Sequence, residues 1–252
     1  ADLFIDCTGF KSMLLEGWMG QQFIPFDKHL ANDSAWACRL PYTNREEQMH
    51  NVTDCHALGN GWVWNIPLWS RIGTGYCFSS RFISKEGAQM EFKEHLEATY
   101  GKDIADAADM FHIKIKHGYR RKAFVKNVVG IGLSYGFVEP LESTGLLTTH
   151  ENILKLVDLI NRRKGYITNS EKEAYNFSVE YDLVGFRDFV SMHYALSMRT
   201  DTPYWRWATQ TNEYHPLQFN DFIPQYNVYT NLLVALQSAN TFQEANQGAN
   251  YI

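Results

Sequence analysis

Residues 136–150 read GFVEPLESTGLLTTH and place two carboxylates directly ahead of the first turn of a predicted helix. A loop that enters a helix offers unpaired backbone N–H groups and the positive end of the helix dipole, which together attract an anion. Glu139 and Glu142 lie beside this turn, and partly buried carboxylates have raised pKa values that suit proton exchange near neutral pH. Gly145 allows a ligand to approach the backbone closely. The spacing therefore suits an anion pocket with a general acid or base beside it.

Helix capping explains the same residues without any reaction. Ser143 or Thr144 can cap the helix, and acidic residues near a helix N-terminus are favourable by ~0.3–1 kcal/mol each. His150, about one turn further on, fits a core or hydrogen-bonding position better than a metal site, since no cluster in the sequence has metal-ligand spacing. The spacing alone leaves capping and chemistry both open.

A second motif, GWVWNIPLWS at 61–70, carries two tryptophans on one side of a predicted strand. Trp62 and Trp64 are two residues apart, so their side chains point the same way, and Pro67 ends regular pairing. Such a pair can cover a core face or form a rigid wall beside a ligand or tunnel. The chain contains 7 Trp, 14 Tyr and 16 Phe, an excess that favours a site for a planar ligand.

The elements that must position these motifs are mainly strands up to residue 142. Residues 2–6 read as a buried strand that ends in a turn at Thr8 and Gly9, and a short helix then closes on Gly20. Residues 111–115 alternate, which predicts a half-exposed strand with Phe111, Ile113 and Ile115 on one face and a solvated basic face. The other predicted strands are 35–42, 49–58, 62–68, 71–79 and 127–132, and the helix in this part is 85–100.

Helices are predicted from residue 143 onward. A Ser170–Glu173 capping box begins a second helix that runs to about Arg199, and Pro203 opens a short third helix. We expect an α/β protein with a mixed sheet in residues 1–142 and a mostly helical part in 143–252. The expected core face of the first helix consists of Leu146, Leu147, His150, Ile153, Leu154, Val157 and Ile160, and that of the second of Val179, Leu183, Phe186, Val190 and Tyr194.

Composition and charge limit the classes of partner and the cellular compartment that the sequence favours. The net charge of −5 and the pI of about 6.0 give no argument for nucleic-acid or membrane-surface binding. The four cysteines form no C-x-x-C pair, which favours a reduced, cytoplasmic compartment. The opening ADLFIDCTGF is not a signal peptide, and no apolar run approaches the ~20 residues that span a bilayer.

Two motifs in the expected order resemble the signatures of the flavin-dependent halogenases: W-x-W-x-I-P at 62–67 and F-x-x-P-x-x-S-x-G at 137–145. The fuller match FVEPLESTG, with RDFVSMHYALSMRTDTPYWRW at 187–207, resembles the tryptophan-halogenase branch. DLFIDCTGFKSMLL at 2–15 resembles the end of that family's flavin-binding region. The resemblance runs to about residue 210 and implies an FAD-binding module of the aromatic-hydroxylase type followed by a helical substrate region.

The resemblance also implies a reaction. Reduced FAD, supplied by a separate flavin reductase, and O2 convert a bound halide into hypohalous acid, which travels through a tunnel to a small aromatic substrate such as tryptophan or another indole. Chloride and bromide are the implied halides. No metal, nucleic acid or membrane is implied, and a homo-oligomer is left open.

Roles are carried over position by position. Glu142 matches the catalytic glutamate, Ser143 a serine next to the active site, and Thr144 and Gly145 the halide site; Glu139 is expected to be a rim or capping residue. The residues that match flavin contacts are Leu133, Leu146, Thr8 and Gly9. The residues that match the substrate or tunnel wall are Trp62, Trp64, Ile66, Pro67 and Phe137.

The sequence departs from the family pattern in two respects. The G-x-G-x-x-G turn and the active-site lysine of the family are expected upstream of the matched region, and Lys11 and Lys28 do not lie in the matching context. We therefore expect this chain to be a C-terminal portion that is inactive alone. Two alternatives stay open: a related flavin-dependent aromatic hydroxylase, and a non-catalytic remnant that binds aromatic ligands.

Overall fold

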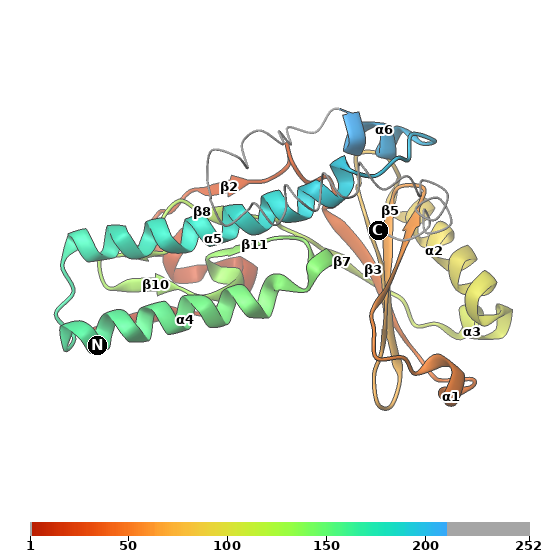
Figure 1. The fold of residues 1–252 in the computed structure, drawn as a ribbon, viewed down its shortest axis with the longest axis horizontal. Helices are drawn as coiled ribbons and strands as arrows, with labels where there is room; N and C mark the ends of the chain where they lie inside the picture. Colours follow the sequence, from red (N-terminus) through yellow and green to blue (C-terminus); the bar gives the residue numbers. More distant parts are fainter. Residues whose placement is uncertain (1, 211–252) are drawn as a thin grey trace, which may run out of the picture. The chain divides into compact units, whose positions relative to one another are not determined.

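The computed structural model describes residues 2–210, and its contacts divide the chain into two compact units (Figure 1). Unit 1 comprises Ala1–Asp33 and Ile115–Ser191, and unit 2 comprises Ser34–Lys114 and Met192–Ile252. The boundary expected between residues 142 and 143 lies inside unit 1. The mixed α/β class is confirmed, with strands dominating the first part of the chain and helices the part after residue 143.

Unit 1 contains two three-stranded sheets. In the first, β1 pairs in parallel with β10, and β10 pairs antiparallel with β9; in the second, β8 lies between β11 and β2 and all pairs are antiparallel. The bounds are β1 (Phe4–Asp6), β10 (Val128–Gly130), β9 (Phe124–Val125), β11 (Gly136–Phe137), β8 (Gly118–Arg120) and β2 (Phe23–Pro25).

The strand expected at residues 2–6 exists, but the expectation that it is buried is wrong for two of its residues. Phe4 and Ile5 are exposed and only Asp6 is buried, because within residues 2–210 β1 lies at the edge of its sheet and pairs only with β10. The short helix expected before Gly20 is confirmed as a π-helical segment, Met13–Trp18.

Two long helices, α4 (Thr144–Arg163) and α5 (Asn169–Ala195), run side by side (Figure 1), and α5 belongs to unit 1 as far as Ser191. The Tyr175 hydroxyl of α5 donates to the backbone carbonyl of Asn152 in α4 over 3.1 Å. The core face predicted for α4 is wrong: α4 buries Leu156 and Leu159, whereas the predicted stripe from Leu146 to Val157 is exposed. Periodicity identifies an apolar face but does not say which neighbour, if any, covers it.

The second long helix agrees with the expectation except at its two ends: it ends at Ala195 rather than near Arg199, and its cap differs. Its predicted stripe is buried at Val179, Leu183 and Val190. The capping box is formed by Thr168 and Glu171 rather than by Ser170 and Glu173, because the Glu171 carboxylate accepts from the Thr168 N–H and hydroxyl, both at 2.8 Å. No helix within residues 2–210 combines the length and the apolar character needed to cross a membrane.

Unit 2 is built on a five-stranded antiparallel sheet with the order β4-β5-β6-β3-β7. Its strands are β3 (Ser34–Leu40), β4 (Asp54–Leu58), β5 (Gly61–Pro67), β6 (Ile72–Phe78) and β7 (Phe111–Lys114). Its helices are α1 (Arg45–Gln48), α2 (Lys85–Tyr100), α3 (Lys102–Ala107) and α6 (Pro203–Gln210). The predicted β5–β6 hairpin, helix 85–100 and helix after Pro203 are therefore confirmed, and the strand predicted for 49–58 is shorter.

One face of this sheet packs on α2 and forms a core around Val63, Tyr76 and Phe92. The faces predicted for residues 111–115 are wrong, because Phe111 and Ile113 are exposed while the ring of His112 packs against Trp36 and Phe78. The cause is the register: His112 lies opposite Trp36, on the face that α2 covers.

Candidate active site

The first group of predicted site residues lies where β1 and β10 end. The two strands are parallel with Asp6 opposite Gly130, so their carboxyl ends lie side by side. A turn follows each strand directly: the turn after β1 contains Thr8 and Gly9, and the turn after β10 contains Leu133. A hydrogen bond joins the two turns, because the Ser12 hydroxyl donates to the Ser134 carbonyl over 2.7 Å. Ligands of parallel α/β sheets bind outside the carboxyl ends of the strands. The structure thus brings Thr8, Gly9 and Leu133 together.

Asp6 is fully buried and organises the first of these turns. Its carboxylate accepts from the N–H groups of Leu14 and Leu15, both at 2.8 Å, and from the N–H and hydroxyl of Thr8 at 3.0 and 2.6 Å. Burial alone would raise the pKa of Asp6, but the hydrogen bonds from Thr8, Leu15 and Leu14 together hold it below its usual range. Sequence reasoning missed this role, although an aspartate that ends a strand before Thr-Gly was its signal.

Arg120 is fully buried and ties the two turns together. Its guanidinium donates to the Phe10 carbonyl at 2.9 Å, to the Leu133 carbonyl at 3.1 Å and to the Glu16 carboxylate at 2.6 Å. Burial would raise the pKa of Glu16, but the bond and charge of Arg120, with Lys116, lower it. Arg120 comes from β8, far away in sequence, so the motif gave no sign of it.

The second group of site residues surrounds the N-terminus of α4. Ser143 adopts a left-handed conformation with φ 54° and ψ 28°, and its side chain makes no capping hydrogen bond. Ser143 is therefore the N-cap by position but does not cap the helix with its hydroxyl. A non-glycine residue in this region costs of the order of 1–3 kcal/mol, and such strain clusters at functional sites.

The two carboxylates of the motif lie in opposite environments. Glu139 is fully buried, so the expectation of a rim or capping position is wrong. Glu142 is exposed. A short 3₁₀ turn, Pro140–Glu142, causes the difference, because it directs Leu141 into the core and Glu142 outward. Glu142 is thus the accessible carboxylate immediately before the helix.

Phe137 connects the turns at the strand ends to the start of α4. Its ring packs edge-on against Phe10 with centroids 5.7 Å apart. A β-carbon built on Gly145 would lie 3.3 Å from Phe137 Cε2, so a larger residue at 145 would press on the ring. Leu133 and Leu146, the remaining expected flavin contacts, expose their side chains in the same unit.

The predicted tunnel residues Trp62, Trp64, Ile66 and Pro67 belong to β5 of unit 2. Trp62 is buried and Trp64 half-buried, with ring centroids 6.1 Å apart. The Trp64 ring lies over Gly75 on β6, where a β-carbon would come within 2.2 Å of Trp64 Cζ2. Both tryptophans occupy the sheet face opposite α2, because Val63 between them packs in the α2 core.

The hairpin tip just before Trp62 is held by side chains that sequence reasoning did not single out. Glu91 Oε1 accepts from the Gly59 N–H at 2.6 Å, Thr202 Oγ1 donates to the Gly59 carbonyl at 2.7 Å, and Trp205 Nε1 donates to the Leu58 carbonyl at 2.7 Å. Every one of these contacts lies within unit 2. The segment around 199–207 thus fixes the turn from which the tryptophan strand begins.

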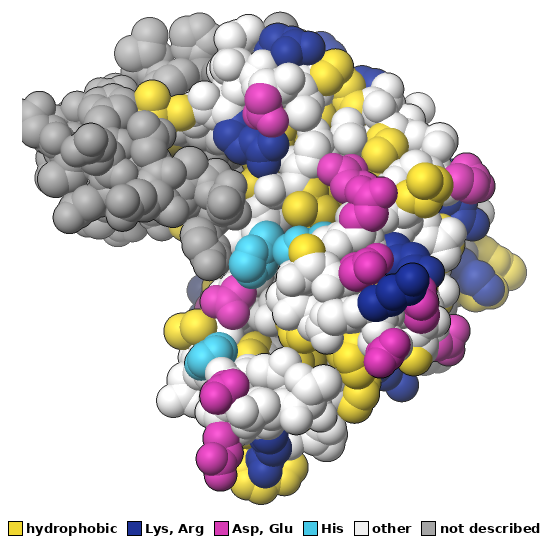
Figure 2. All heavy atoms as spheres, turned by 90° about the vertical axis from the view of Figure 1, so that its right-hand side faces the viewer, with side chains coloured by type: hydrophobic (Ala, Val, Ile, Leu, Met, Phe, Trp, Pro, Cys, Tyr) yellow, Lys and Arg dark blue, Asp and Glu magenta, His cyan; other side chains and the backbone are white. Residues whose placement is uncertain are grey.

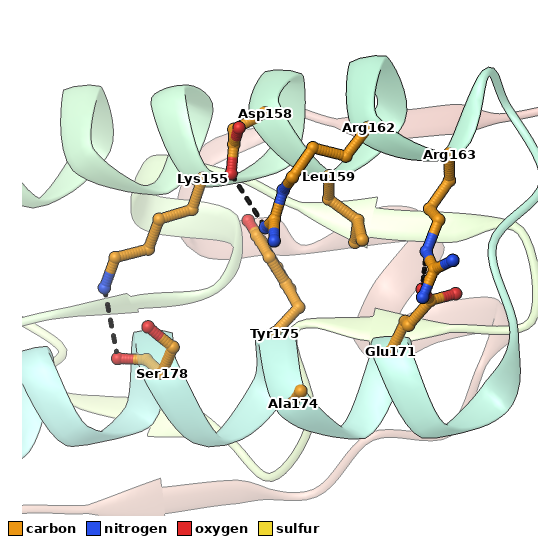
Figure 3. Close-up of a pocket in the computed structure, with 9 residues that line it drawn as sticks. All are labelled: Lys155, Asp158, Leu159, Arg162, Arg163, Glu171, Ala174, Tyr175 and Ser178. Carbon is orange, nitrogen blue, oxygen red and sulfur yellow. Dashed lines mark hydrogen bonds and ion pairs between the residues drawn. The ribbon is translucent and has the colours of Figure 1, made fainter.

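A cavity of about 570 Å³ between α4 and α5 contains none of the predicted site residues (Figure 3). It is lined by Lys155, Arg162 and Arg163, but each is paired with a carboxylate: with Asp182, with Asp158 at 2.7 Å and with Glu171, respectively. The cations are thus neutralised, and this cavity does not offer a site for an anion.

A more open cavity of about 810 Å³ lies in unit 2 and is lined by Asp54, His56, Asn65 and Tyr100 among others. Asn65 alternates with Trp64 along β5, so this cavity and the tryptophans lie on opposite sheet faces. Figure 2, the space-filling view of the right-hand side of Figure 1, shows acidic, basic and histidine side chains interspersed on the side of the molecule that faces the viewer.

Comparisons with known proteins agree on one family. The family model described as tryptophan halogenase matches residues 1–246. The tryptophan 7-halogenase RebH of Lentzea aerocolonigenes is 36% identical over 208 residues, which cover 82% of this chain and 38% of RebH. The tryptophan 6-halogenase SttH of Streptomyces toxytricini is 38% identical over 205 residues, 81% of this chain and 38% of SttH.

Solved structures support the same assignment. The apo structure of VirX1 matches 92% of this chain and 44% of VirX1 with a TM-score of 0.83 and 60% identity. The crystal structure of SttH matches 87% of this chain and 42% of that protein, with a TM-score of 0.80 and 35% identity. The chain spans about two fifths of the length of these relatives. The chain belongs to the tryptophan halogenase family.

Proposed function

We propose that this chain forms the C-terminal part of a cytoplasmic, FADH2- and O2-dependent halogenase that acts on tryptophan or an indole-like substrate through hypohalous acid formed at the flavin. The observation that carries the proposal is the start of α4, where the accessible Glu142 directly precedes a helix N-terminus that its N-cap side chain leaves uncapped. RebH and SttH, which the chain resembles, are tryptophan halogenases by name.

The residues at the strand ends suit a flavin. Two backbone turns, at Thr8–Gly9 and before Leu133, lie at the carboxyl ends of parallel strands, and Leu133 and Leu146 offer exposed apolar side chains for an aromatic ring system. When bound there, reduced FAD supplies, with O2, the oxidising equivalents that the halide needs. A separate flavin reductase supplies the reduced cofactor.

The α4 N-terminus suits the halide. A monovalent anion is stabilised by N–H donors and by the positive end of the dipole, and the first turn of this 20-residue helix offers both at Thr144 and Gly145. The left-handed Ser143 turns the chain from the Pro140–Glu142 segment into the helix. Because Thr144 is buried, the halide is shielded from competing water on that side.

Glu142 acts on the aromatic substrate. Electrophilic halogenation leaves the attacked ring carbon with both a halogen and a hydrogen, and a carboxylate can accept the proton that departs. Glu142 is exposed and lies two residues before Thr144, so it serves the same reaction centre as the turn at Thr144 and Gly145 that holds the halide. Ser143, between Glu142 and Thr144, positions the carboxylate relative to that turn.

Trp62 and Trp64 act as a rigid wall that keeps the substrate from the flavin, so that hydroxylation does not compete. Their placement is supported by the packing of Trp64 over Gly75 and by the three side chains that hold the hairpin tip. Ile66 and Pro67 extend this strand.

The test is a chimera in which this chain replaces the matched region of VirX1, to which it is 60% identical. The chimera is incubated with a flavin reductase, tryptophan, indoles or phenols, and chloride, bromide or iodide, and products are identified by mass spectrometry. We expect halogenated products whose yield depends on the halide. Flavin absorbance of the purified chimera verifies that the cofactor is bound.

Each other outcome identifies an alternative. Hydroxylated products without halogenated ones would assign the chain to a flavin-dependent aromatic hydroxylase. A chimera that holds flavin and binds indoles, but forms neither product, would identify a non-catalytic aromatic-binding remnant. Either result would overturn the proposal. This chain by itself is expected to show no turnover.

A further inference from the structure

Three charged side chains of unit 1 meet beside the two turns at the strand ends: Glu16, Lys116 and Arg120. Arg120 Nη2 lies 2.6 Å from Glu16 Oε2, and Lys116 Nζ lies 3.4 Å from the same oxygen. Arg120 Nε donates to this oxygen as well, at 3.0 Å. One carboxylate therefore serves two cations, so the three residues, which we call the Arg120 cluster, carry a net charge of +1.

Arg120 is the member of the cluster that water does not reach. Its side chain is 0% exposed, whereas the side chains of Glu16 and Lys116 are each 39% exposed. Water weakens the field of a charge that it contacts, while a buried charge acts through a medium of lower dielectric constant. Arg120 therefore contributes the larger part of the field that the cluster exerts on the two turns, and the sign of that field is positive.

The ring of Phe23 on β2 helps to hold the two cations close together. Lys116 Nζ lies 4.3 Å and Arg120 Cζ 5.0 Å from the centroid of this ring. The face of an aromatic ring attracts cations, and this attraction offsets part of the repulsion between the two like charges. The ring thus supports a positively charged cluster that contains a single carboxylate.

The guanidinium of Arg120 contacts the backbone of both turns that are proposed to hold the flavin. It donates to the Phe10 carbonyl at 2.9 Å and to the Leu133 carbonyl at 3.1 Å. Its charge therefore lies directly behind the backbone on which the cofactor would rest. Asp6, a second fully buried charge in this region, accepts four hydrogen bonds at the first turn, whereas Arg120 spans both turns.

The two oxidation states of a flavin differ in charge. Reduction of the neutral ring takes up two electrons and, at neutral pH, one proton, so the reduced ring is an anion. A positive charge near the ring stabilises the anion more than it stabilises the neutral form, and charge placed near the ring nitrogens is a means by which proteins tune a flavin. A buried arginine behind the flavin turns therefore favours the reduced cofactor.

We propose that Arg120 makes this site select reduced over oxidised flavin, and that Glu16 and Lys116 set the strength of the preference. The proposal rests on the proposed function and deepens it, because an enzyme that receives reduced flavin from a separate reductase has to bind it in competition with the oxidised form. Arg120 acts through the backbone of the two turns, so it is a positioning and charge-bearing residue rather than a catalytic one.

The experiment measures the dissociation constants of the VirX1 chimera for oxidised FAD and, without dioxygen, for reduced FAD. The quantity compared is the ratio of the oxidised to the reduced constant. Arg120→Met should lower this ratio about threefold or more. Glu16→Gln removes a negative charge but keeps an oxygen acceptor for Arg120, and should raise the ratio about twofold, because the partly exposed carboxylate is screened. The two shifts have opposite signs because the charges removed have opposite signs.

Arg120→Lys separates the charge of Arg120 from its geometry. Lysine keeps the positive charge, but one ammonium group replaces the planar fork that reaches Phe10, Leu133 and Glu16 together. Both affinities should fall in this variant while their ratio stays within about twofold of the parent. If all three variants lower both affinities in equal proportion and leave the ratio unchanged, Arg120 is only a structural support and the proposal is wrong.

The exposed pair of Asp158 and Arg162 on α4 supplies matched controls, since its side chains are 61% and 69% exposed. Asp158→Asn and Arg162→Met change the net charge in the same two directions as Glu16→Gln and Arg120→Met. The ratio should stay within about twofold in both controls, because water and salt screen these charges. Shifts as large as those of the cluster variants would mean that the ratio follows overall charge, which would overturn the proposal.

The remaining outcomes are also decisive. If Arg120→Met does not fold, Glu16→Gln decides alone, and a ratio that is unchanged or lower in that variant overturns the proposal. The ratio is measured by binding, without turnover. Opposite shifts in a chimera that forms hydroxylated products alone would count against the proposed function and would support the role of Arg120. A chimera that halogenates, but whose ratio no variant changes, would overturn this proposal alone, and one that binds flavin in neither state would overturn both.

Discussion

The ring of Phe137 lies against Gly145, where an added β-carbon would be 3.3 Å from Phe137 Cε2. The two residues are the first and last of the F-x-x-P-x-x-S-x-G motif, so the contact closes the motif on itself and sets the first turn of α4. At this separation the ring must move by a few tenths of an ångström to admit a methyl group.

This contact predicts the effect of Gly145→Ala. We expect a loss of ~1–3 kcal/mol in the free energy of unfolding, the usual cost of overpacking a tight contact, together with a rise in the KM for halide in the VirX1 chimera. Urea unfolding and halide titration measure the two effects. The double variant Gly145→Ala, Phe137→Leu should recover part of the stability, and an additive double variant would show that the two residues are not coupled.

Glu142→Gln isolates the carboxylate at the α4 N-terminus. The amide keeps the shape of the side chain but cannot accept the proton from the aromatic ring, so kcat should fall about 10²–10⁴-fold, the range for loss of a general base. Flavin binding, followed by absorbance, should stay within twofold. A parallel loss of flavin affinity would mean that Glu142 has a structural role.

Arg120→Met removes the side chain that joins the two turns at the strand ends. The Phe10 and Leu133 carbonyls would lose their guanidinium donors, and each unsatisfied buried polar group costs ~1–3 kcal/mol. We expect the free energy of unfolding to fall by about 2–4 kcal/mol. Arg162→Met is the control, because Arg162 forms an exposed i,i+4 pair worth ~0.3–0.5 kcal/mol. Equal losses in the free energy of unfolding for the two variants would contradict the role of Arg120 in holding the two turns together.

His95 predicts a stability that depends on pH. Burial lowers the pKa of His95 from 6.5 to about 4, and His56, with its ring centroid 5.3 Å away, adds to the effect. The folded chain then binds fewer protons than the unfolded chain between these values. The stabilising contribution is therefore complete above pH 6.5 and is lost as the pH falls towards 4.

His95→Gln should remove this dependence. Urea unfolding between pH 7 and pH 4.5 should show a stability loss that is smaller in the variant by about 1–2 kcal/mol, because solvent screens a half-buried ring. The same pH slope in both proteins would show that the ring takes up its proton without unfavourable interactions.

The sequence alone was sufficient for the helices and strands around the site. The apolar spacing after residue 143 predicts α4, the two strand-like runs at 62–68 and 71–79 predict the β5–β6 hairpin, and the two motifs identify the family. These features are local: a helix or strand is set by residues that lie within a few positions of one another, and a motif is contiguous.

Three features of the site could be found only from the tertiary structure: which face of each helix and strand is buried, which distant side chains hold the site's turns, and which of the two glutamates is accessible. The apolar face of α4 and the apolar residues Phe111 and Ile113 of β7 are exposed, whereas Glu139 is buried, so apolarity alone does not reveal which surface is covered. Arg120 donates to the carbonyl of Phe10, which lies 110 positions earlier, and to that of Leu133, which lies 13 positions later. No local sequence pattern encodes such contacts. The sequence by itself determined the elements and the family, whereas only the fold decided which side chains face the site, because burial and long-range hydrogen bonding depend on what the rest of the chain packs against.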